Sequence, residues 1–370
     1  MTPRERLLCT LRGERADRVP LVLPGLQFPS REDMERLDDP LRRRAAERVH
    51  DWVAFEVGVP SHLNRMLCIP ETAVHRETEE LPDGRRRTHG RIETPRGDLT
   101  FESEWSPQSQ TAWTMKYPVE TYEEIDRIRS VPWHVLESLA PPDLSTLPNG
   151  FGERGILQTR ISSPFVCVAG MMPREWFLEL CLTDLPLIEE LTSICLERTL
   201  AQLDVLLSEP GIEYVWIGGS EWVTAPMASP AIYDALVQEQ ERVLVERAQA
   251  AGAVTHIHCH GNVRHALART IERGADFTEP VEPPPDGDIT MAEAKALANG
   301  RITLGGNIEC RVLCFESETT VEKAVGAAFE GGKERFVFRT TEGPNPRMSE
   351  REFANYLRMI ECWERLSPME

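Results

Sequence analysis

The sequence predicts an α/β fold, a (β/α)8 TIM barrel with an antiparallel hairpin insertion in its N-terminal part. Strands and helices alternate steadily over the second half of the chain, with about five βα units, as in a parallel sheet covered by helices. Further strands precede them, which favours a closed barrel over an open, doubly wound sheet. Both architectures fit the alternation, but no G-x-G-x-x-G motif follows a strand, as a dinucleotide-binding sheet would require.

The N-terminal part begins with a short helix. Thr2 is a good N-cap and Pro3 suits the first helical turn, so residues 2–14 are expected to be helical. The segments that follow are expected to be a strand at 19–23, a charged helix at 31–49 and a strand at 53–57.

Residues 72–105 have a different pattern, in which polar and apolar residues alternate between turn signals. The turns at Pro82-Asp83-Gly84 and Pro95-Arg96-Gly97 predict short antiparallel strands. We interpret this segment as a β meander inserted early in the barrel. It could form a lid over a site, or it could be a solvated hairpin without a functional role.

The second half contains the regular βα units. Strands are expected at 155–161, 212–217, 253–258, 276–278, 302–304 and 336–339. Helices are expected at 174–182, 185–207, 230–250, 263–273, 291–298, 321–330 and 350–366. The glycine pairs Gly218-Gly219 and Gly305-Gly306 are interpreted as tight turns at strand ends.

Composition excludes several classes of partner. The formal net charge is -19, so nucleic acid and anionic membrane surfaces would be repelled. The first residues lack the apolar core of a signal peptide, and no apolar run is long enough to span a membrane. The 9 cysteines have irregular spacing, which is typical of reduced thiols. A cytoplasmic location is therefore expected.

Three histidines at alternate positions are the main functional signal. In a strand, His256, His258 and His260 share one face, while Cys259 faces the other way. Gly261 then begins a turn, so the cluster lies at the carboxyl end of a barrel strand, where such enzymes keep their chemistry. Two imidazoles at this spacing can converge on one metal ion. The alternative is hydrogen-bonded histidines of the core or rim.

The depth of each histidine suggests its role. His258 and His260 are the expected metal ligands, and His256 lies deeper, where it would have a catalytic, orienting role. An H-x-H pair also occurs in amidohydrolase barrels, but there it lies on the first strand with more histidines downstream. Here only His265 follows.

Other polar residues follow the predicted strands. Glu221 is a candidate catalytic residue at the barrel mouth, or a simple loop carboxylate. Glu279 and Glu282 frame a proline-rich loop, and Glu282 is expected to bind substrate. Asn307 is a second candidate for substrate binding, or it could satisfy loop backbone.

Several segments together resemble the uroporphyrinogen decarboxylase superfamily. These are Pro3-Arg4-Glu5-Arg6, Asp17-Arg18-Val19-Pro20, Gly218-Gly219-Ser220-Glu221, Met227-Ala228-Ser229-Pro230, His258-Cys259-His260-Gly261-Asn262, Gly274-Ala275-Asp276, Gly305-Gly306-Asn307-Ile308 and Thr341-Glu342-Gly343-Pro344. Their order and spacing carry the resemblance. It implies that residues 1–370 form one TIM barrel domain of this type.

The resemblance implies one of two activities. Decarboxylases of the superfamily need no metal and hold a porphyrinogen tetracarboxylate with an arginine-rich N-terminal loop. The matching residues 21–28 contain no arginine, and substrate carboxylates need charged partners. The other branch comprises zinc methyltransferases that move a methyl group between a corrinoid protein and a small acceptor or donor, and this branch is nearer.

The zinc pattern of that branch is His-x-Cys-Gly plus a later cysteine. Aligned on Gly261, the chain places His258 on the histidine, His260 on the first cysteine and Glu342 near the second. The resemblance thus implies a His258, His260, Glu342 metal set, which suits zinc or another divalent metal such as iron or manganese. Loss of the thiolate ligands puts a thiol substrate in doubt.

The sequence therefore predicts a metal-dependent methyltransferase-like enzyme. The resemblance implies methylcobalamin or another corrinoid carried by a partner protein, a small-molecule substrate and a homodimer. Two alternatives stay open: uroporphyrinogen decarboxylation, and a barrel that binds a small molecule without catalysis.

Overall fold

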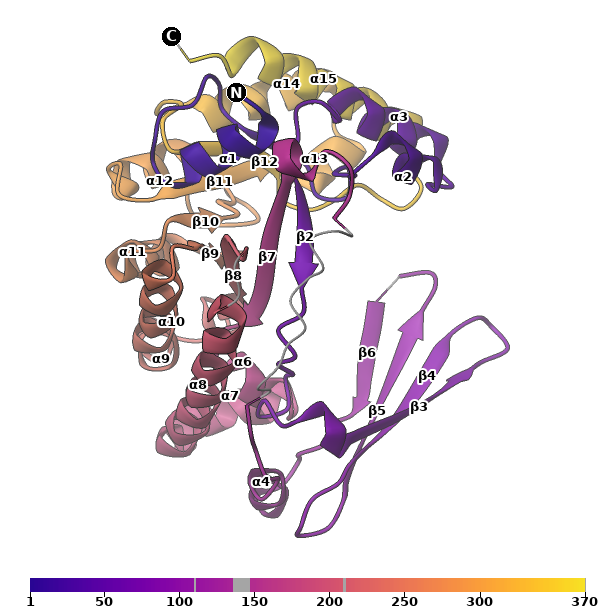
Figure 1. The fold of residues 1–370 in the computed structure, drawn as a ribbon, viewed down its shortest axis with the longest axis vertical. Coiled ribbons are helices and arrows are strands. Elements are labelled where there is room, and N and C mark those ends of the chain that lie inside the picture. The colour runs from indigo at the N-terminus through magenta and orange to yellow at the C-terminus, as the bar shows by residue number, and fades with distance from the viewer. Residues whose placement is uncertain (110, 136–146, 209–210, 370) are drawn as a thin grey trace.

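Eight parallel strands form the centre of the molecule in a computed structural model, which describes residues 1–109, 111–135, 147–208 and 211–369. Their order is β1-β12-β11-β10-β9-β8-β7-β2, so strands adjacent in the sheet follow one another along the chain. A parallel bridge between Leu21 and Val53 joins the two ends of the sheet and closes the ring. The predicted α/β barrel is confirmed (Figure 1).

The barrel strands are short and mostly buried. They are β1 (Leu21–Val22), β2 (Phe55–Val59), β7 (Gly155–Ser162), β8 (Tyr214–Gly218), β9 (Val254–His258), β10 (Phe277–Glu279), β11 (Thr303–Ile308) and β12 (Phe336–Thr340). The helices in the first half are α1 (Pro3–Leu11), α2 (Arg31–Glu35), α3 (Pro40–Val49), η1 (Glu71–Ala73) and α4 (Tyr122–Arg129). Those that follow are α5 (Phe151–Arg154), α6 (Val166–Ala169), α7 (Arg174–Thr183), α8 (Leu185–Ser208), η3 (Ser220–Val223), α9 (Pro230–Tyr233), η4 (Asp234–Gln238), α10 (Glu239–Ala250), α11 (Arg264–Arg273), α12 (Met291–Ala298), α13 (Cys310–Phe315), α14 (Glu318–Phe329) and α15 (Glu350–Leu366).

The predicted insertion is an antiparallel sheet of four strands. These are β3 (Val74–Glu80), β4 (Arg86–Ile92), β5 (Leu99–Ser106) and β6 (Thr111–Lys116). The sheet projects beside the barrel, beyond the ends of β2 and β7 (Figure 1). Its extent differs from the expected 72–105, because β6 adds a fourth strand whose six residues are all exposed and so give no alternation to detect.

Helix α1 closes the amino end of the barrel. Leu7, Leu8 and Leu11 on one face of this helix are buried against inward-facing residues of the strands. Burial of each leucine contributes about 2 kcal/mol. The residues of this layer that lie in the strands, or next to β2 in the case of Ala54, are Val22, Ala54, Ile156, Tyr214, Val254, Phe277 and Val337. The interior is therefore a packed floor, and polar side chains in the barrel lie above it, toward the carboxyl ends of the strands.

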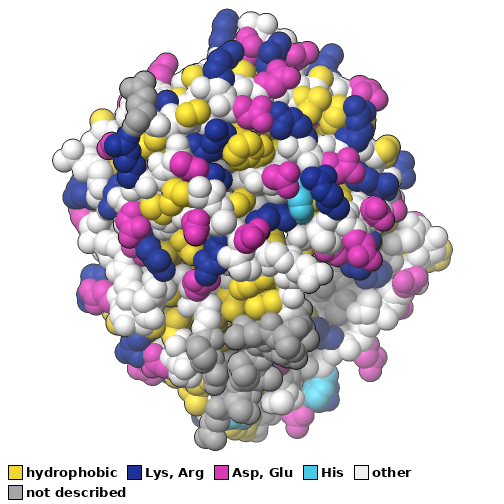
Figure 2. All heavy atoms as spheres, turned by 45° about the horizontal axis from the view of Figure 1, so that its top comes forward, with side chains coloured by type: hydrophobic (Ala, Val, Ile, Leu, Met, Phe, Trp, Pro, Cys, Tyr) yellow, Lys and Arg dark blue, Asp and Glu magenta, His cyan; other side chains and the backbone are white. Residues whose placement is uncertain are grey.

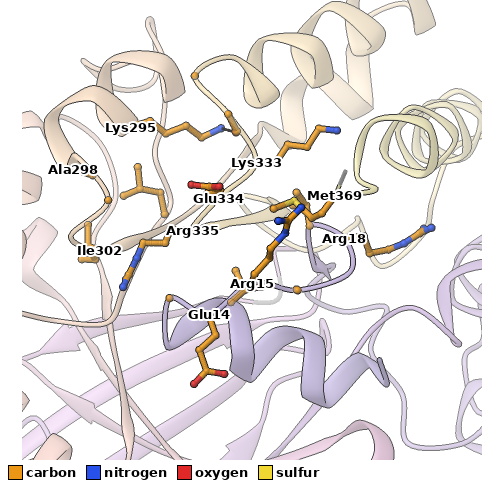
Figure 3. Close-up of a pocket in the computed structure, with 18 residues that line it drawn as sticks. Glu14, Arg15, Arg18, Lys295, Ala298, Ile302, Lys333, Glu334, Arg335 and Met369 are labelled. Atoms are coloured by element: carbon orange, nitrogen blue, oxygen red, sulfur yellow. Dashed lines mark hydrogen bonds between the residues drawn. The ribbon is translucent and has the colours of Figure 1, made fainter.

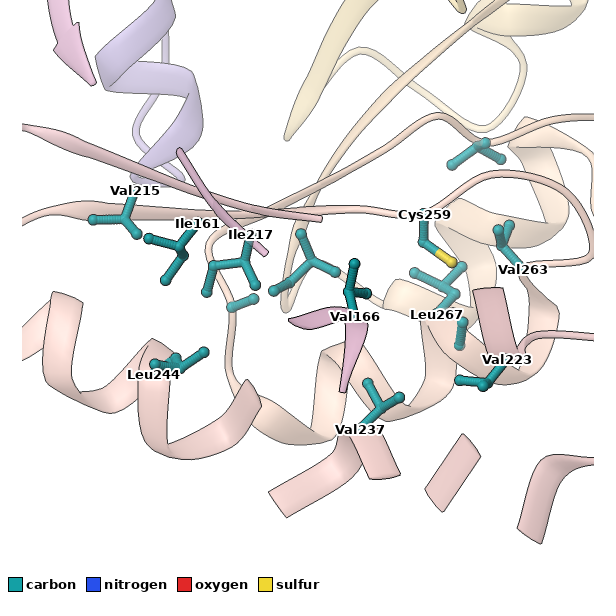
Figure 4. Close-up of a cluster of buried hydrophobic side chains, with 14 of the residues drawn as sticks. Ile161, Val166, Val215, Ile217, Val223, Val237, Leu244, Cys259, Val263 and Leu267 are labelled. Carbon is teal, nitrogen blue, oxygen red and sulfur yellow. The ribbon is translucent and has the colours of Figure 1, made fainter. Parts of the chain in front are cut away.

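A second apolar layer lies between the strands and the surrounding helices. Ile161 of β7 and Ile217 of β8 point toward the helical layer, where Leu244 of α10 is drawn, and Leu267 of α11 lies near Cys259 (Figure 4). Each of these side chains is buried. This outward packing fixes the strands from behind, so that the opposite, inward-facing residues are held in place.

A cavity of about 820 Å³ lies at the amino ends of β1, β11 and β12. Arg15, Lys295, Lys333 and Arg335 are among its lining residues (Figure 3). It is at the opposite end of the strands from the histidine cluster. The charged side chains of the surface seen in Figure 2 are mixed, with basic and acidic groups next to one another.

Several expected elements differ from those observed. The helix expected at 31–49 is split into α2 and α3, because Pro40 starts a new helix capped by Asp39. The helix expected at 230–250 contains a π turn, η4. Gly305 and Gly306 do not form a strand-end turn but lie inside β11. Gly305 packs closely against Phe277 and Glu279 of β10. Among the described residues, no helix is long and apolar enough to cross a membrane.

Candidate metal centre and its buried support

The inward face of β9 carries the first two histidines of the cluster, one above the other. Val254 belongs to the apolar floor, His256 lies above it, and His258 ends the strand. His256 is 3 % exposed, whereas the His258 side chain is 19 % exposed. His260 lies beyond the strand, and its ring centroid is 4.7 Å from that of His258. The structure therefore places His258 and His260 side by side at the barrel mouth, as the alternation predicts.

Glu279 at the end of β10 is the centre of a buried network. Its Oε1 atom lies 2.8 Å from Nδ1 of His258, 2.9 Å from Nε2 of His256 and 2.9 Å from a terminal nitrogen of Arg339. Burial alone would raise the pKa of Glu279, but Arg339 and the histidines outweigh it and hold this pKa well below its usual range. Glu279 is therefore an ionised acceptor, and Nδ1 of His258 must donate to it.

His256 has a polar neighbour at each ring nitrogen. Its Nδ1 is 2.7 Å from the Tyr214 hydroxyl, and its Nε2 faces Glu279 at 2.9 Å, though without the alignment of a good hydrogen bond. Burial lowers the pKa of His256 to about 4 and raises that of Tyr214 well above its usual value. The tyrosine hydroxyl thus donates to a neutral imidazole, whose Nε2–H points at the carboxylate.

Arg339 reaches Glu279 across an intervening strand. It lies on β12, in register with Asn307 of β11, and β11 separates it from β10. Gly305 of β11 makes the approach possible, because a Cβ atom there would lie 2.7 Å from Cβ of Glu279 and 2.6 Å from the Phe277 ring. The Arg339 Nε also donates to the Thr340 carbonyl oxygen at 3.1 Å, which fixes the guanidinium.

His260 has its own carboxylate partner. Its Nδ1 is 3.0 Å from Oε1 of Glu282, whose Oε2 accepts from the Gly261 backbone N–H at 2.5 Å. Burial acts to lower the pKa of His260, but the hydrogen bond and the charge of Glu282 outweigh it, so this pKa lies above its usual value. Glu282 thus holds the histidine and its turn, and its expected contact with substrate stays a prediction.

Further carboxylates surround His260. Glu309, which follows β11, is 8 % exposed, and its Oε1 has no hydrogen-bond partner in the described chain. Burial and the negative charges of Glu282 and Asp286 raise the pKa of Glu309 to about 7. Glu221 is half-buried, and its Oε2 also has no hydrogen-bond partner in the described chain. Its negative charge helps to raise the pKa of His260. This effect on His260 agrees with the predicted position of Glu221 at the barrel mouth.

In the described chain, the remaining predicted residues make no hydrogen bond or ion pair with the histidines. Glu342 follows β12 and is exposed, and its backbone carbonyl accepts from the Thr340 hydroxyl at 2.7 Å. In the described residues, the one group of three potential ligand atoms within 4.8 Å of one another is His256, His258 and Glu279. Glu342 and His260 are outside it. Asn307 is buried beside Arg339, without a side-chain hydrogen bond in the described residues.

Some ligand atoms of this cluster already have hydrogen-bond partners, whereas others are free to bind a cation. In the inner group, the contacts of Glu279 Oε1 are 2.8–2.9 Å long, which are hydrogen-bond distances, and Arg339 shares that oxygen. A metal ion there would have to displace the arginine. By contrast, Nε2 of His258 and of His260 has no polar partner in the described chain, while each Nδ1 is held by a carboxylate. This pairing is the usual environment of metal-binding histidines.

The sequence did not single out Arg339 or Tyr214. Tyr214 lies two residues before Trp216 on the inward face of β8, and a period of two would have placed it in the barrel. Arg339 lies within the strand expected at 336–339, and a charged residue inside an apolar strand (Phe336–Thr340) is unusual and points to a buried partner.

A family model and solved structures are similar to this chain. The family model for uroporphyrinogen decarboxylase (URO-D) matches residues 115–362. A methyltransferase from Methanosarcina mazei superposes with a TM-score of 0.60 at 16 % identity, covering 99 % of each chain. A B12-independent methionine synthase from a Shewanella species gives 0.41 at 10 % identity, covering 79 % of this chain and 75 % of that one. No curated protein sequence matches the chain.

The likeness to the Methanosarcina protein, at this identity, shows the fold. The family model shows more, because its match covers well over half of the chain. The chain therefore belongs to the uroporphyrinogen decarboxylase family.

Proposed function

We propose that this chain is a metal-dependent methyltransferase-type enzyme of its family, with a divalent metal, zinc first among them, held by Nε2 of His258 and His260. The observation that carries the proposal is the pair of imidazoles at the barrel mouth. Their rings are 4.7 Å apart, and each Nδ1 is bound to a buried carboxylate. Because both carboxylates accept from Nδ1, both Nε2 lone pairs are left for the ion.

The side chains around the pair have distinct tasks in this proposal. A bound divalent metal would act as a Lewis acid and activate a substrate thiol or water. Glu279 and Glu282 orient the two histidines, and His256 lies beneath them as a neutral, buried support. Glu221, with its unpartnered oxygen near His260, is placed to hold a proton or a polar group of the substrate.

The metal proposal is tested by elemental analysis and by variants. Purified protein loaded with zinc and desalted should retain about one equivalent per chain, and the H258A/H260A double variant should retain almost none. Glu342→Ala tests the third ligand that the family resemblance implies, by a loss of zinc affinity. The control is Glu361→Ala on the exposed side of α15, which should retain zinc like the unmodified protein. Full zinc retention in the double variant would refute the site.

The reaction is tested on the same preparations. Zinc-loaded protein is incubated with methylcobalamin and small thiols, and loss of the cobalt-bound methyl group is followed in the visible spectrum. The proposal expects turnover that disappears in H258A/H260A. A corrinoid-carrying partner protein follows from the family resemblance and would be sought if free methylcobalamin reacts slowly.

The geometry favours this activity over porphyrinogen decarboxylation. A tetracarboxylate substrate needs free cations, and the two arginines that act on the carboxylates Glu279 and Glu309 of the cluster are already paired. Arg339 pairs with Glu279, and Arg311 with Asp286. Glu221 and the ionised fraction of Glu309, each with one oxygen that has no hydrogen-bond partner in the described chain, would repel such a substrate. Metal-independent turnover of uroporphyrinogen by H258A/H260A would overturn the proposal in favour of the decarboxylase.

A further inference from the structure

We propose that Arg339 is a positioning residue that fixes Glu279, and through it His258, in the orientation needed to present Nε2 to the metal; this rests on the metal site proposed above. Arg339 itself is on a different strand from both residues and touches neither the metal position nor the outer ring nitrogen of His258 in the described contacts. Its effect is therefore exerted through the carboxylate.

Arg339 supplies the permanent positive charge that Glu279 faces. The carboxylate is 1 % exposed, and the arginine side chain is 10 % exposed. A buried carboxylate without a charged partner is strongly disfavoured, and it would rotate or change its environment to recover one. Because Arg339 is 2.9 Å from the same oxygen that accepts from His258 Nδ1, it holds that oxygen at the histidine.

The Arg339 guanidinium is held by a hydrogen bond within its own strand, and the absence of a side chain at Gly305 on the next strand leaves room for it. Its Nε donates to the carbonyl oxygen of Thr340, so the planar group cannot swing freely. Gly305 leaves the space beside Glu279 that any larger residue would occupy. Arg339 on β12, Gly305 on β11 and Glu279 on β10 thus form one structural unit across three adjacent strands.

Arg339→Met tests this positioning role, because methionine keeps much of the packing volume of arginine but removes its charge and its hydrogen-bond donors. We expect its zinc affinity, measured by competition with a chromogenic chelator, to fall about 10–100-fold. The visible spectrum of the cobalt-substituted variant should show the same number and type of metal ligands as that of the unmodified protein, since the substitution removes no ligand. Arg339→Lys restores the charge and should recover part of the affinity.

Arg273→Met is the matched control. Arg273 is another buried arginine with a carboxylate partner, but it lies in the helical layer. Its loss should reduce stability without changing zinc affinity, which separates a positioning effect from a general loss of folding. If Arg339→Met does not fold, Gly305→Ala gives a second route, because its new methyl group pushes against Glu279 and should also weaken zinc binding.

The outcomes of the experiment are distinguishable. If unmodified protein binds no zinc, the proposed function fails and this inference with it. If unmodified protein binds zinc and a folded Arg339→Met binds it within twofold as tightly, only the positioning role is overturned. An affinity loss in Arg273→Met equal to that in Arg339→Met would also overturn it.

Discussion

A single carboxylate oxygen at Glu279 determines how the inner part of this site can be used. Three nitrogen atoms lie within 2.9 Å of it, from His256, His258 and Arg339. Such crowding favours the ionised acid, engages the Nδ1 donor of His258 and turns the Nε2–H of His256 toward the same oxygen. The consequence is that His258 presents its other nitrogen outward. The buried histidine below it has no free nitrogen and acts as support.

A pH dependence follows at His260. Glu282 holds the pKa of His260 above its usual value, against the effect of burial. For a raised histidine pKa, the stabilisation from this pair is fully present below about pH 6.5, the unfolded value, and is lost as the pH rises through the folded value. In metal-free protein, imidazole NMR titration should give a His260 pKa above that of a free histidine, and Glu282→Gln should lower it.

A His260 pKa that is unchanged in Glu282→Gln would contradict the assignment of this pair.

The site was predictable where it depends on strand alternation. A period of two correctly placed His256 and His258 on one face of β9, although the strand ends at His258 and His260 lies beyond it, next to the turn at Gly261. The partners were not predictable, because Glu279, Glu282 and Arg339 come from strands and loops 21 to 81 residues further on, and the sequence does not state which side chains meet inside a barrel. For the same reason the sequence could not show what completes the metal site: the Glu342 side chain is exposed, and its role as a ligand stays a prediction.

The elements around the site are held by polar contacts as well as by apolar packing. Arg273 at the end of α11 and Glu241 in α10 form a fully buried ion pair at 2.8 Å. The same guanidinium contacts the Tyr233 hydroxyl, the Gln238 side chain at 3.0 Å and Thr270 at 2.7 Å. It therefore joins α10 and α11 to the π turn η4 between α9 and α10.

Loss of Arg273 should therefore be costly. Arg273→Met leaves Glu241 buried without its charged partner, and breaking such a pair typically costs about 3–5 kcal/mol. Arg358→Met on α15 removes exposed ion pairs and should cost no more than about 1 kcal/mol. Denaturant unfolding of the two variants checks this difference. Equal unfolding free energies would show that the buried pair does not stabilise the helical layer.

Element identity was predictable from pattern, while element boundaries and context were not. The expected strand at 253–258 agrees with β9, and the expected helix at 291–298 agrees with α12, which starts with a capping box at Thr290. Gly305-Gly306 was misread because glycine pairs usually mark turns, whereas here tertiary crowding by Glu279 and Phe277 requires a residue without a side chain inside β11.

At the scale of the whole molecule, the barrel and the antiparallel sheet differ in how they are stabilised. All five residues of β12 are buried, and each of the barrel strands β7 to β12 has hydrogen-bonded neighbours on both sides. In the antiparallel sheet, β6 is an edge strand that pairs only with β5. Local opening of such an edge exposes little new apolar surface and breaks few contacts, so its free energy should be small.

This difference predicts the pattern of amide hydrogen exchange in the full chain. Peptides that cover β9 to β12 should exchange slowest, because opening them disrupts the apolar floor and the buried ion pairs together. Peptides that cover β6 should exchange fastest among the described strands, with β3, the other edge strand, next. Hydrogen exchange measured by mass spectrometry over seconds to hours checks this order. If β6 is protected as long as β9, its edge must be covered in solution, since an uncovered edge strand of exposed residues has no other source of protection.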